Sequence, residues 1–212
     1  MSEELIQGSD AWRLARVGSL GASRLSEAIA RTKTGYGASR ANLMAELICE
    51  RLTGQPADRF VTQAMQHGTD TEPEARNAYS FYCGREVEQV GLIRHPSIER
   101  THASPDGLIG SDGMLEVKCP QPAAHLETLL GQDIPAKYVT QMMWQMACSG
   151  RQWVDFCSYS PALPESMRVF VKRLHRDDNR IAELEAEAIA FLKEIASKIA
   201  QLENLYGERA AA

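Results

Sequence analysis

The spacing of apolar positions divides the chain into a helical beginning, a strand-rich middle and a long helical end. Between Ser39 and Gly54, apolar side chains such as Leu43 and Leu47 recur three or four positions apart, which predicts an amphipathic helix. Ser39 is expected to cap this helix and Gly54 to end it. The first part of the chain is also predicted to contain a short helix beginning at Ser9 or Asp10, a helix over residues 22–31, a glycine-rich loop over 32–37, and a helix over 69–83 with Pro73 in its first turn.

The middle of the chain changes to the period of two that is typical of strands. Residues 101–118 predict a β-hairpin, with a four-residue tip at 110–113 that begins and ends with glycine. Further elements are predicted as a strand over 87–93, a helix from Pro135 to just before Gly150, and strands over 153–159 and 168–174. This order predicts an α/β fold, with a central mixed β-sheet flanked by helices, in one domain over residues 1–212.

The last segment, residues 177–206, predicts one long C-terminal helix. Apolar residues recur every three or four positions from Ile181 to Tyr206. We expect this helix to pack on the sheet or at a subunit interface. Its polar face is acidic rather than basic, which disfavours binding to a membrane surface.

Composition excludes several classes of protein. The 212 residues are 44% hydrophobic and 24% charged, as in an ordinary globular protein. The longest apolar runs are too short to span a membrane, and the N-terminus lacks the pattern of a signal peptide. Five cysteines without a CxxC pair argue against a disulfide framework or a structural zinc site, so a reducing cytoplasm is the expected location.

The residues with the most informative chemistry lie in the predicted hairpin. Glu116 and Lys118 point to the same face of a strand, and a four-residue tip would place Asp106 opposite Val117. Asp106, Glu116 and Lys118 are therefore expected to converge on one side. Two carboxylates and a backbone oxygen suit Mg²⁺ or Mn²⁺, and such an ion with a neighbouring lysine suits phosphodiester hydrolysis. Taken separately, Pro105-Asp106-Gly107 could be only a turn, and Glu116 and Lys118 only a charged pair on a strand.

Several short motifs in order resemble those of one family. Pro105-Asp106 followed by Glu116-Val117-Lys118 resembles the signature of PD-(D/E)xK nucleases. More narrowly, the chain resembles the bacteriophage lambda exonuclease family of viral alkaline exonucleases. Five stretches carry this resemblance: Trp12-x3-Arg16-x-Gly18-x2-Gly21-Ala22-Ser23, Gly68-x3-Glu72-x3-Arg76, Ser104-Pro105-Asp106-Gly107, Leu115-Glu116-Val117-Lys118-Cys119-Pro120 and Tyr138-x2-Gln141.

The resemblance implies a role for each matching residue. Asp106, Glu116 and the carbonyl of Val117 would bind the metal, and Glu72 would reach the metal shell from its helix. Lys118 would position or activate the attacking water, and Gln141 would lie beside that water or the scissile phosphate. The remaining transfers concern DNA binding: Arg16, Ser23 and Ser104 would bind a 5′-terminal phosphate, Met65 would be an apolar wedge between base pairs, and Lys33 would contact the duplex.

Plainer interpretations remain open for individual positions. Trp12 is interpreted as a core or interface aromatic residue. Arg16 could be a surface residue, Ser23 a helix cap, and Glu72 a residue that favours a helix N-terminus. Gln141 could belong to a polar stripe with Gln145. The histidines are unassigned, and none is expected to act as a general base: His67, His95, His102, His125 and His175.

The resemblance also implies an activity. We expect a 5′-to-3′ exonuclease on linear double-stranded DNA that requires Mg²⁺, with two ions per active site, and releases mononucleotides. A ring-shaped homotrimer, processivity, a single-strand annealing protein as partner, and a phage or prophage gene expressed in a bacterial cytoplasm are further implications. The alternatives are an endonuclease or a nuclease of other polarity, a non-catalytic DNA-binding module of the same fold, and an assembly protein organised by the terminal helix.

The charge distribution is compatible with DNA as the substrate. The formal net charge of −5, taken alone, argues mildly against a DNA-binding protein. From Trp12 to Ala45, however, six basic residues stand against Glu27 as the single acidic one. Seven acidic and three basic residues between Asp177 and Glu203 account for most of the net charge. The segment with the predicted phosphate pocket is therefore locally basic.

Overall fold

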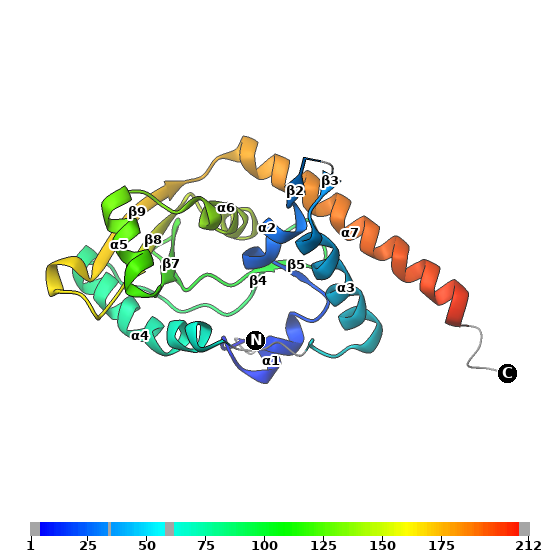
Figure 1. The fold of residues 1–212 in the computed structure, drawn as a ribbon, viewed down its shortest axis with the longest axis horizontal. Coiled ribbons are helices and arrows are strands. Elements are labelled where there is room, and N and C mark those ends of the chain that lie inside the picture. Colours follow the sequence, from blue (N-terminus) through cyan, green and yellow to red (C-terminus); the bar gives the residue numbers. More distant parts are fainter. Residues whose placement is uncertain (1–4, 34, 58–61, 208–212) are drawn as a thin grey trace.

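A computed structural model describes residues 5–33, 35–57 and 62–207 (Figure 1). The helices of this part are α1 (Asp10–Ala15), η1 (Ala22–Arg24), α2 (Leu25–Ala28), α3 (Ala38–Thr53), α4 (Gln63–Cys83), α5 (Pro122–Gly131), α6 (Ala136–Ser149), η2 (Glu165–Met167) and α7 (Asp178–Tyr206). The strands are β1 (Leu20–Gly21), β2 (Arg31–Thr32), β3 (Gly35–Tyr36), β4 (Ile93–Arg94), β5 (Thr101–Ala103), β6 (Gly107–Ile109), β7 (Gly113–Lys118), β8 (Trp153–Tyr159) and β9 (Val169–His175).

The strands form two main sheets and a small ribbon. The larger sheet has the order β6-β7-β8-β9 and is mixed, because β7 and β8 run parallel whereas the other neighbours are antiparallel. A three-stranded sheet of order β1-β5-β4 brings the beginning of the chain beside its middle. The predicted mixed α/β architecture is therefore confirmed, although its strands are divided between two sheets.

The two faces of the larger sheet pack against different helices. Met114 and Phe156 point into the larger core, which also contains buried side chains from α2, α3, α6 and α7. Leu115 and Cys157 point the opposite way, into a smaller core with Tyr79 from α4. Alternation along β7 and β8 thus places successive residues in two separate environments.

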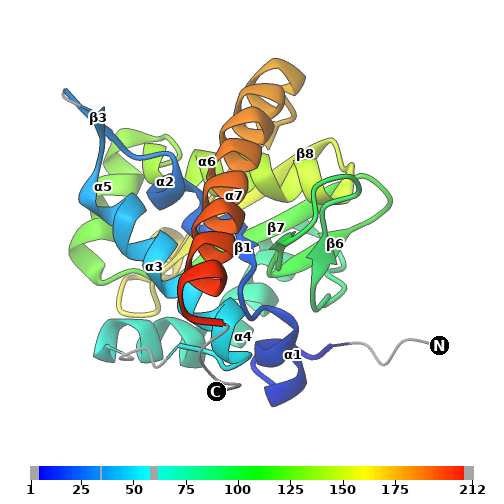
Figure 2. The same ribbon diagram turned by 90° about the vertical axis from the view of Figure 1, so that its right-hand side faces the viewer.

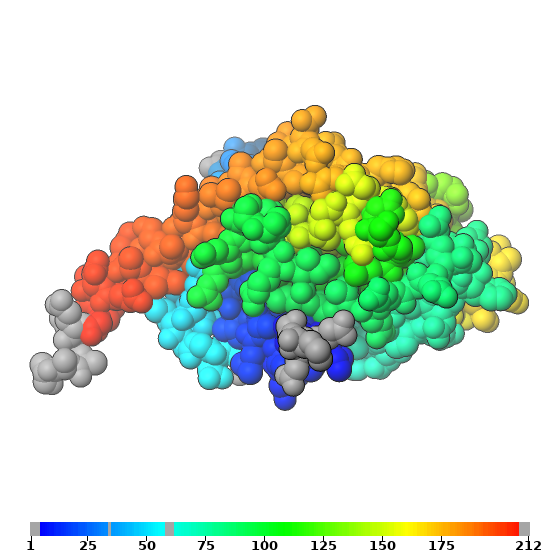
Figure 3. All heavy atoms as spheres, turned by 180° about the vertical axis from the view of Figure 1, so that it is seen from behind, coloured from blue at the N-terminus to red at the C-terminus, as the bar shows by residue number. Residues whose placement is uncertain are grey.

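The long C-terminal helix is confirmed. The side chain of Asp177 accepts a hydrogen bond from the Arg180 backbone and so caps α7. The buried residues of α7 end at Ile195, whereas Leu205 and Tyr206 are 66% and 63% exposed. Its far end projects beyond the neighbouring elements (Figure 3). No helix in the described ranges has the length and apolar character needed to cross a membrane.

The helix predicted over residues 69–83 is longer than expected, and the position of Pro73 within it is a correction. α4 begins at Gln63, where the side chain of Thr62 accepts a hydrogen bond from the Met65 backbone. Pro73 therefore lies inside the helix rather than in its first turn. A proline there removes one backbone donor and costs about 3 kcal/mol. Burial of Ala75 and Tyr79 on the following turns helps to offset that cost.

Three further predictions differ from the structure, and one helix was not predicted. The helix predicted over 22–31 is a short 3-10 turn followed by α2, and it ends at Ala28. The predicted loop over 32–37 contains part of the antiparallel ribbon β2–β3, which projects from the body (Figure 2). Gly37, rather than Ser39, occupies the N-cap of α3. Helix α5, which was not predicted, begins with Pro122 in its first turn.

Candidate active site

The hairpin that carries the predicted metal ligands has a different register from the one expected. Thr101–Ala103 belongs to the three-stranded sheet, so only β6 and β7 form the hairpin. Ile109 pairs with Gly113, which leaves a three-residue tip in which Gly110 has a φ of 54°. Continuing the ladder by one pair places Asp106 opposite Glu116, not opposite Val117 as predicted. Because residues directly opposite each other point to the same face, this register brings the two carboxylates together.

Glu116 is held from several directions although only 1% of it is exposed. Its Oε1 accepts a hydrogen bond from Gln141 Nε2 at 2.6 Å and lies 2.5 Å from Lys118 Nζ. Its Oε2 accepts from Gln145 Nε2. The two glutamines stand four residues apart on α6 and therefore share one face of that helix. The role of Gln145 was missed, and its spacing from Gln141 was the signal that could have identified it.

Asp106 and Lys118 complete the cluster around Glu116. Asp106 Oδ2 accepts a hydrogen bond from the Val117 backbone at 2.6 Å. Burial and the neighbouring Glu116 carboxylate raise the pKa of Asp106 well above its usual range. Burial alone would lower the pKa of Lys118, but the carboxylates of Glu116 and Asp106 raise it overall. The lysine is therefore an ammonium group between two acids.

The donor set fits a hard divalent cation with few protein ligands. No group of three His, Cys, Asp or Glu side chains in the described ranges is arranged to hold a metal. Asp106 and Glu116 nevertheless supply two adjacent carboxylates, and the carbonyl of Val117 is next in the strand. Mg²⁺ commonly binds through one or two carboxylates and keeps several waters. A cation would also relieve the repulsion that raises the pKa of Asp106.

Glu72 lies beside this cluster but is turned to another partner. Its carboxylate forms an ion pair with Arg76, one turn later on α4. Its charge still contributes to the raised pKa of Asp106, so the two carboxylates are neighbours. Glu72 is far from the N-terminus of α4, so the interpretation that it favours a helix start is wrong.

The predicted phosphate-binding residues come together in a separate small cavity. Arg16, Ser23 and Ser104 line a cavity of about 170 Å³, although Ser104 lies far along the chain from the other two. Gln141 lines the same cavity, and its amide also donates to Glu116. The cavity therefore adjoins the carboxylate cluster through one shared side chain.

Trp12 lines this cavity and is not part of the hydrophobic core, so the core alternative of its interpretation as a core or interface aromatic residue is wrong. Its Nε1 donates a hydrogen bond to Ser104 Oγ at 3.3 Å. The Arg16 guanidinium carbon lies 3.9 Å from the centre of the Trp12 ring. A guanidinium on an aromatic face is a favourable cation–π arrangement. Trp12 thus contacts two of the three predicted phosphate ligands.

The two remaining DNA-binding predictions are less central. Met65 is 54% exposed near the beginning of α4, and Lys33 is exposed in the β2–β3 ribbon. Among the described contacts, neither residue lines the small cavity or forms a hydrogen bond to the carboxylates.

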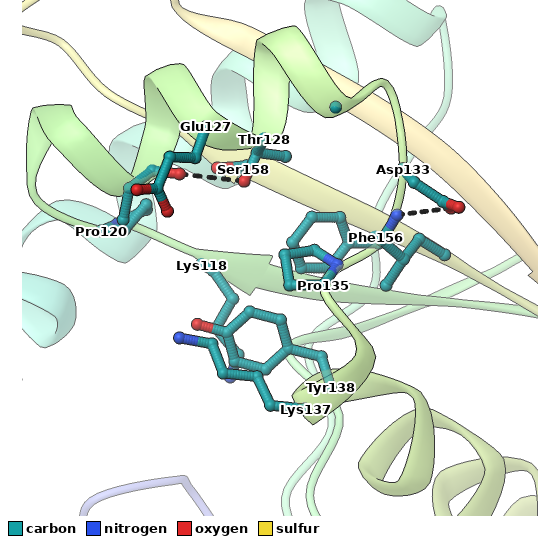
Figure 4. Close-up of a pocket in the computed structure, with 13 residues that line it drawn as sticks. Lys118, Pro120, Glu127, Thr128, Asp133, Pro135, Lys137, Tyr138, Phe156 and Ser158 are labelled. Carbon is teal, nitrogen blue, oxygen red and sulfur yellow. Dashed lines mark hydrogen bonds between the residues drawn. The ribbon is translucent and has the colours of Figure 1, made fainter.

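A second hollow lies on the other side of Lys118, between β7, α5 and α6. Figure 4 shows Lys118, Lys137 and Tyr138 grouped at its edge, with Phe156 next to Pro135 above them. The rings of Tyr138 and Phe156 stack at 5.5 Å, and Lys118 Nζ lies 5.2 Å from the Tyr138 ring centre. Tyr138 and Gln141 are separated by one helical turn, which explains why the Tyr138-x2-Gln141 motif faces β7.

Cys119 follows the cluster directly but is not suited to nucleophilic chemistry. Burial, with a smaller contribution from the Glu72 charge, raises the pKa of its thiol to about 12. The thiol therefore stays protonated and cannot act as a thiolate nucleophile near neutral pH.

Comparison with known proteins identifies the family. The model of the YqaJ-like viral recombinase domain matches residues 11–152. This chain belongs to that family. The match extends from α1 to the residue before β8. It contains the carboxylate cluster and the predicted phosphate-binding residues of the small cavity, whereas α7 lies outside it. The resemblance to viral recombination exonucleases that the sequence motifs indicated is confirmed.

Solved structures support the same assignment within the YqaJ-like family. An alkaline exonuclease from Laribacter hongkongensis is 46% identical, with a TM-score of 0.88, over 94% of this chain and 99% of the other. That enzyme has also been solved in complex with dAMP, with the same degree of similarity. A phage-related exonuclease from Haemophilus somnus 129PT is 14% identical over 87% of this chain and 96% of its own, with a TM-score of 0.72, and shares the fold. No curated protein matches the chain.

Proposed function

We propose that this protein is a Mg²⁺-dependent exonuclease that degrades the 5′-ended strand of linear double-stranded DNA and releases 5′-mononucleotides. Membership of the YqaJ-like viral recombinase family and the 46% identity to an alkaline exonuclease support nuclease activity on DNA. The observation that carries the polarity is the shared position of Gln141, which lines the Arg16 cavity and donates to Glu116. A terminal phosphate in that cavity would bring the adjoining phosphodiester toward the carboxylates.

The cavity suits a terminal phosphate on chemical grounds. Arg16 offers charged donors, and Ser23 and Ser104 offer hydroxyl groups, which together match the oxygens of a phosphate dianion. An internal phosphodiester carries less charge and continues in both directions along the strand. Binding a terminal phosphate would therefore set the register of cleavage at one nucleotide per cut.

The carboxylate cluster suits the hydrolytic step. Asp106, Glu116 and the Val117 carbonyl would hold Mg²⁺, which when bound polarises a phosphoryl oxygen and offsets developing charge. The Lys118 ammonium, fixed by Glu116, would donate a hydrogen bond to the attacking water and stabilise negative charge on the phosphate. Gln141 would orient the same water or the scissile phosphate, because its amide already lies against Glu116. Mn²⁺ is expected to replace Mg²⁺.

Assembly and biological context follow from the family and remain part of the proposal. We expect a ring-shaped homotrimer that encloses the duplex, because a closed ring explains processivity without tight contacts to the DNA. The 3′ overhang left by digestion would be bound by a single-strand annealing protein during phage-type recombination. These steps would take place in the cytoplasm of a bacterial host.

One asymmetric substrate tests most of this proposal. A linear duplex with a 5′-phosphate at one end and a 5′-hydroxyl at the other is incubated with Mg²⁺ or with chelator, and the products are sized. We expect mononucleotides to appear from the phosphorylated end in the presence of Mg²⁺ alone. Internal fragments, release from the 3′ ends, or equal digestion with chelator would each contradict the proposal.

A further inference from the structure

We propose that His102 is a positioning residue of the phosphate cavity, which orients the Arg16 guanidinium through a hydrogen-bond acceptor that carries no negative charge. This inference rests on the proposed function in one respect, namely that Arg16 binds the 5′-phosphate. His102 is not part of the motifs that predicted the site, and the sequence left its role unassigned.

The hydrogen bonds of His102 define its protonation state. Arg16 Nε donates to His102 Nε2 at 3.1 Å, so this ring nitrogen must be unprotonated. The other ring nitrogen, Nδ1, lies 2.8 Å from Ser19 Oγ. In a neutral imidazole the proton must then be on Nδ1, which donates to Ser19. One ring thus connects a fixed hydroxyl to the guanidinium.

The surroundings of His102 keep this arrangement rigid and neutral. The residue is 2% exposed in β5, where it pairs with Gly21 of β1 on one side and Arg94 of β4 on the other. Burial lowers its pKa to about 3, and the charges of Arg16 and Arg94 act in the same direction. The imidazole therefore remains an acceptor at any pH at which the protein would meet DNA.

An uncharged acceptor has an advantage over a carboxylate at this position. A carboxylate would orient Arg16 at least as firmly, but it would also place a negative charge beside the phosphate dianion. The bond to His102 uses Nε, so it fixes the plane of the guanidinium without using the edge that carries the two terminal nitrogens. That edge is one of the two edges of a guanidinium that can bind a pair of phosphate oxygens. The face of the same group lies on Trp12.

Gly21 provides a second observation that this contact is built into the fold. A Cβ atom at position 21 would lie 3.1 Å from His102 Nε2 and 3.6 Å from an Arg16 terminal nitrogen. Gly21 has a φ of −84°, which any residue can adopt, so the backbone conformation does not require glycine. The glycine is instead explained by the space that the Arg16–His102 pair needs.

Three substitutions at His102 separate orientation from charge. His102→Gln keeps a neutral acceptor, His102→Leu removes the acceptor, and His102→Glu supplies a charged acceptor. The readout is the ratio of initial digestion rates for duplexes with a 5′-phosphate and a 5′-hydroxyl, with KM and kcat measured for each. We expect Gln to retain the ratio within about threefold, whereas Leu and Glu lower it about 10-fold or more through KM. His175→Gln and His175→Glu, at an exposed position at the end of β9, are the matched controls and should leave the ratio unchanged.

Two further variants keep the result interpretable. If His102→Leu or His102→Glu fails to fold in thermal melts, Gly21→Ala leaves the histidine in place, crowds its contact with Arg16, and should lower the ratio several-fold. Arg16→Ala tests the underlying function and should bring the ratio close to one. One result would overturn the role of His102 but not the phosphate pocket. In that result Arg16→Ala abolishes the wild-type preference for a 5′-phosphate, whereas His102→Leu or Gly21→Ala keeps it. Retention of the full ratio in His102→Glu would overturn the charge argument, and a wild-type ratio of one would overturn the phosphate pocket together with this inference.

Discussion

Two buried carboxylates on neighbouring strands of the larger sheet have opposite characters. Glu116 on β7 is 1% exposed and Asp155 on β8 is 3% exposed. Leu115 is the register partner of Asp155, so Glu116 points to the opposite face of the sheet. Glu116 lies against α6 near the cavities, whereas Asp155 lies on the face covered by α4.

The surroundings of Asp155 neutralise it completely. Arg173 donates to both carboxylate oxygens, at 2.8 and 2.9 Å, and the Tyr79 hydroxyl donates a third hydrogen bond at 2.7 Å. The Arg173 guanidinium also lies 3.5 Å from the Trp153 ring centre. Burial, and then the hydrogen bond to Asp155, raise the pKa of Tyr79, so the phenol stays a donor. One anion, one cation and one neutral donor form a closed set that needs no ligand.

The surroundings of Glu116 leave a charge imbalance. Two neutral glutamine amides and one ammonium group face Glu116, but Asp106 is a second carboxylate beside it. The raised pKa of Asp106 shows that the protein does not balance a second negative charge at this position, and a bound cation would supply that balance. Burial of a charged residue therefore does not by itself identify an active site. The distinguishing feature is whether the partners inside the protein balance the charge.

The largest effect that we predict is on activity, from Glu116→Gln. The variant keeps the shape of the side chain but removes the charge that would hold the metal and Lys118. We expect digestion of duplex DNA to fall at least about 10³-fold. Thermal unfolding should show a folded protein, because removing one of two adjacent carboxylates also removes their repulsion. Near-normal digestion by a folded Glu116→Gln protein would show that the imbalance at Glu116 has no catalytic meaning.

On the other face, Asp155→Ala should affect stability and not chemistry. It leaves the Arg173 guanidinium and the Tyr79 hydroxyl without their acceptor in a mostly buried position. We expect the free energy of unfolding to fall by about 3 kcal/mol, as measured by urea denaturation. The activity per folded molecule should stay near that of the unmodified protein. A variant with full stability and lost activity would reverse the roles that we assign to the two carboxylates.

The elements that follow from local pattern were predictable from the sequence, whereas their pairing was not. The long terminal helix follows from its apolar spacing, and Gly54, Gly84 and Gly150 end their helices in the left-handed conformation. The position of Asp106 opposite Glu116 depends on whether the hairpin tip has three or four residues, and the glycine pattern fits both. Pro73 was misplaced because helix propensity alone does not account for the tertiary packing that supports α4.

The same distinction applies to the site residues. Glu116 and Lys118 share a face by strand alternation, so their proximity is a local property. Asp155 is the one charged residue of strand β8, and only the register of β8 with β9 brings Arg173 opposite it. His102 likewise acquires its role from the pairing of β5 with β1, and Arg16 is 86 residues away along the chain. Contacts between such distant residues leave no periodic signal in a single sequence.

His102 is a third buried group, and unlike the two carboxylates it remains neutral. The effect on stability that we predict from it is the smallest of those discussed. Burial and the nearby Arg16 and Arg94 lower the pKa of His102 to about 3, below the ordinary value of about 6.5 in an unfolded chain. Between these two pKa values the unfolded chain is protonated at His102, whereas the folded protein is not. The free energy of unfolding therefore falls as the pH falls from about 6.5 toward 3. Between pH 7 and pH 5 the loss should be about 2 kcal/mol.

Urea denaturation at both pH values should show this loss in the unmodified protein and in His175→Gln, but a correspondingly smaller one in His102→Gln. His95, whose pKa is also lowered by burial, is present in all three proteins and cancels in the comparison. Equal pH dependence in all three would mean that the pKa of His102 is the same in the folded protein as in the unfolded chain. The hydrogen bond from Arg16 would then not protect Nε2 from protonation near pH 5, which would contradict the arrangement that we assign to it.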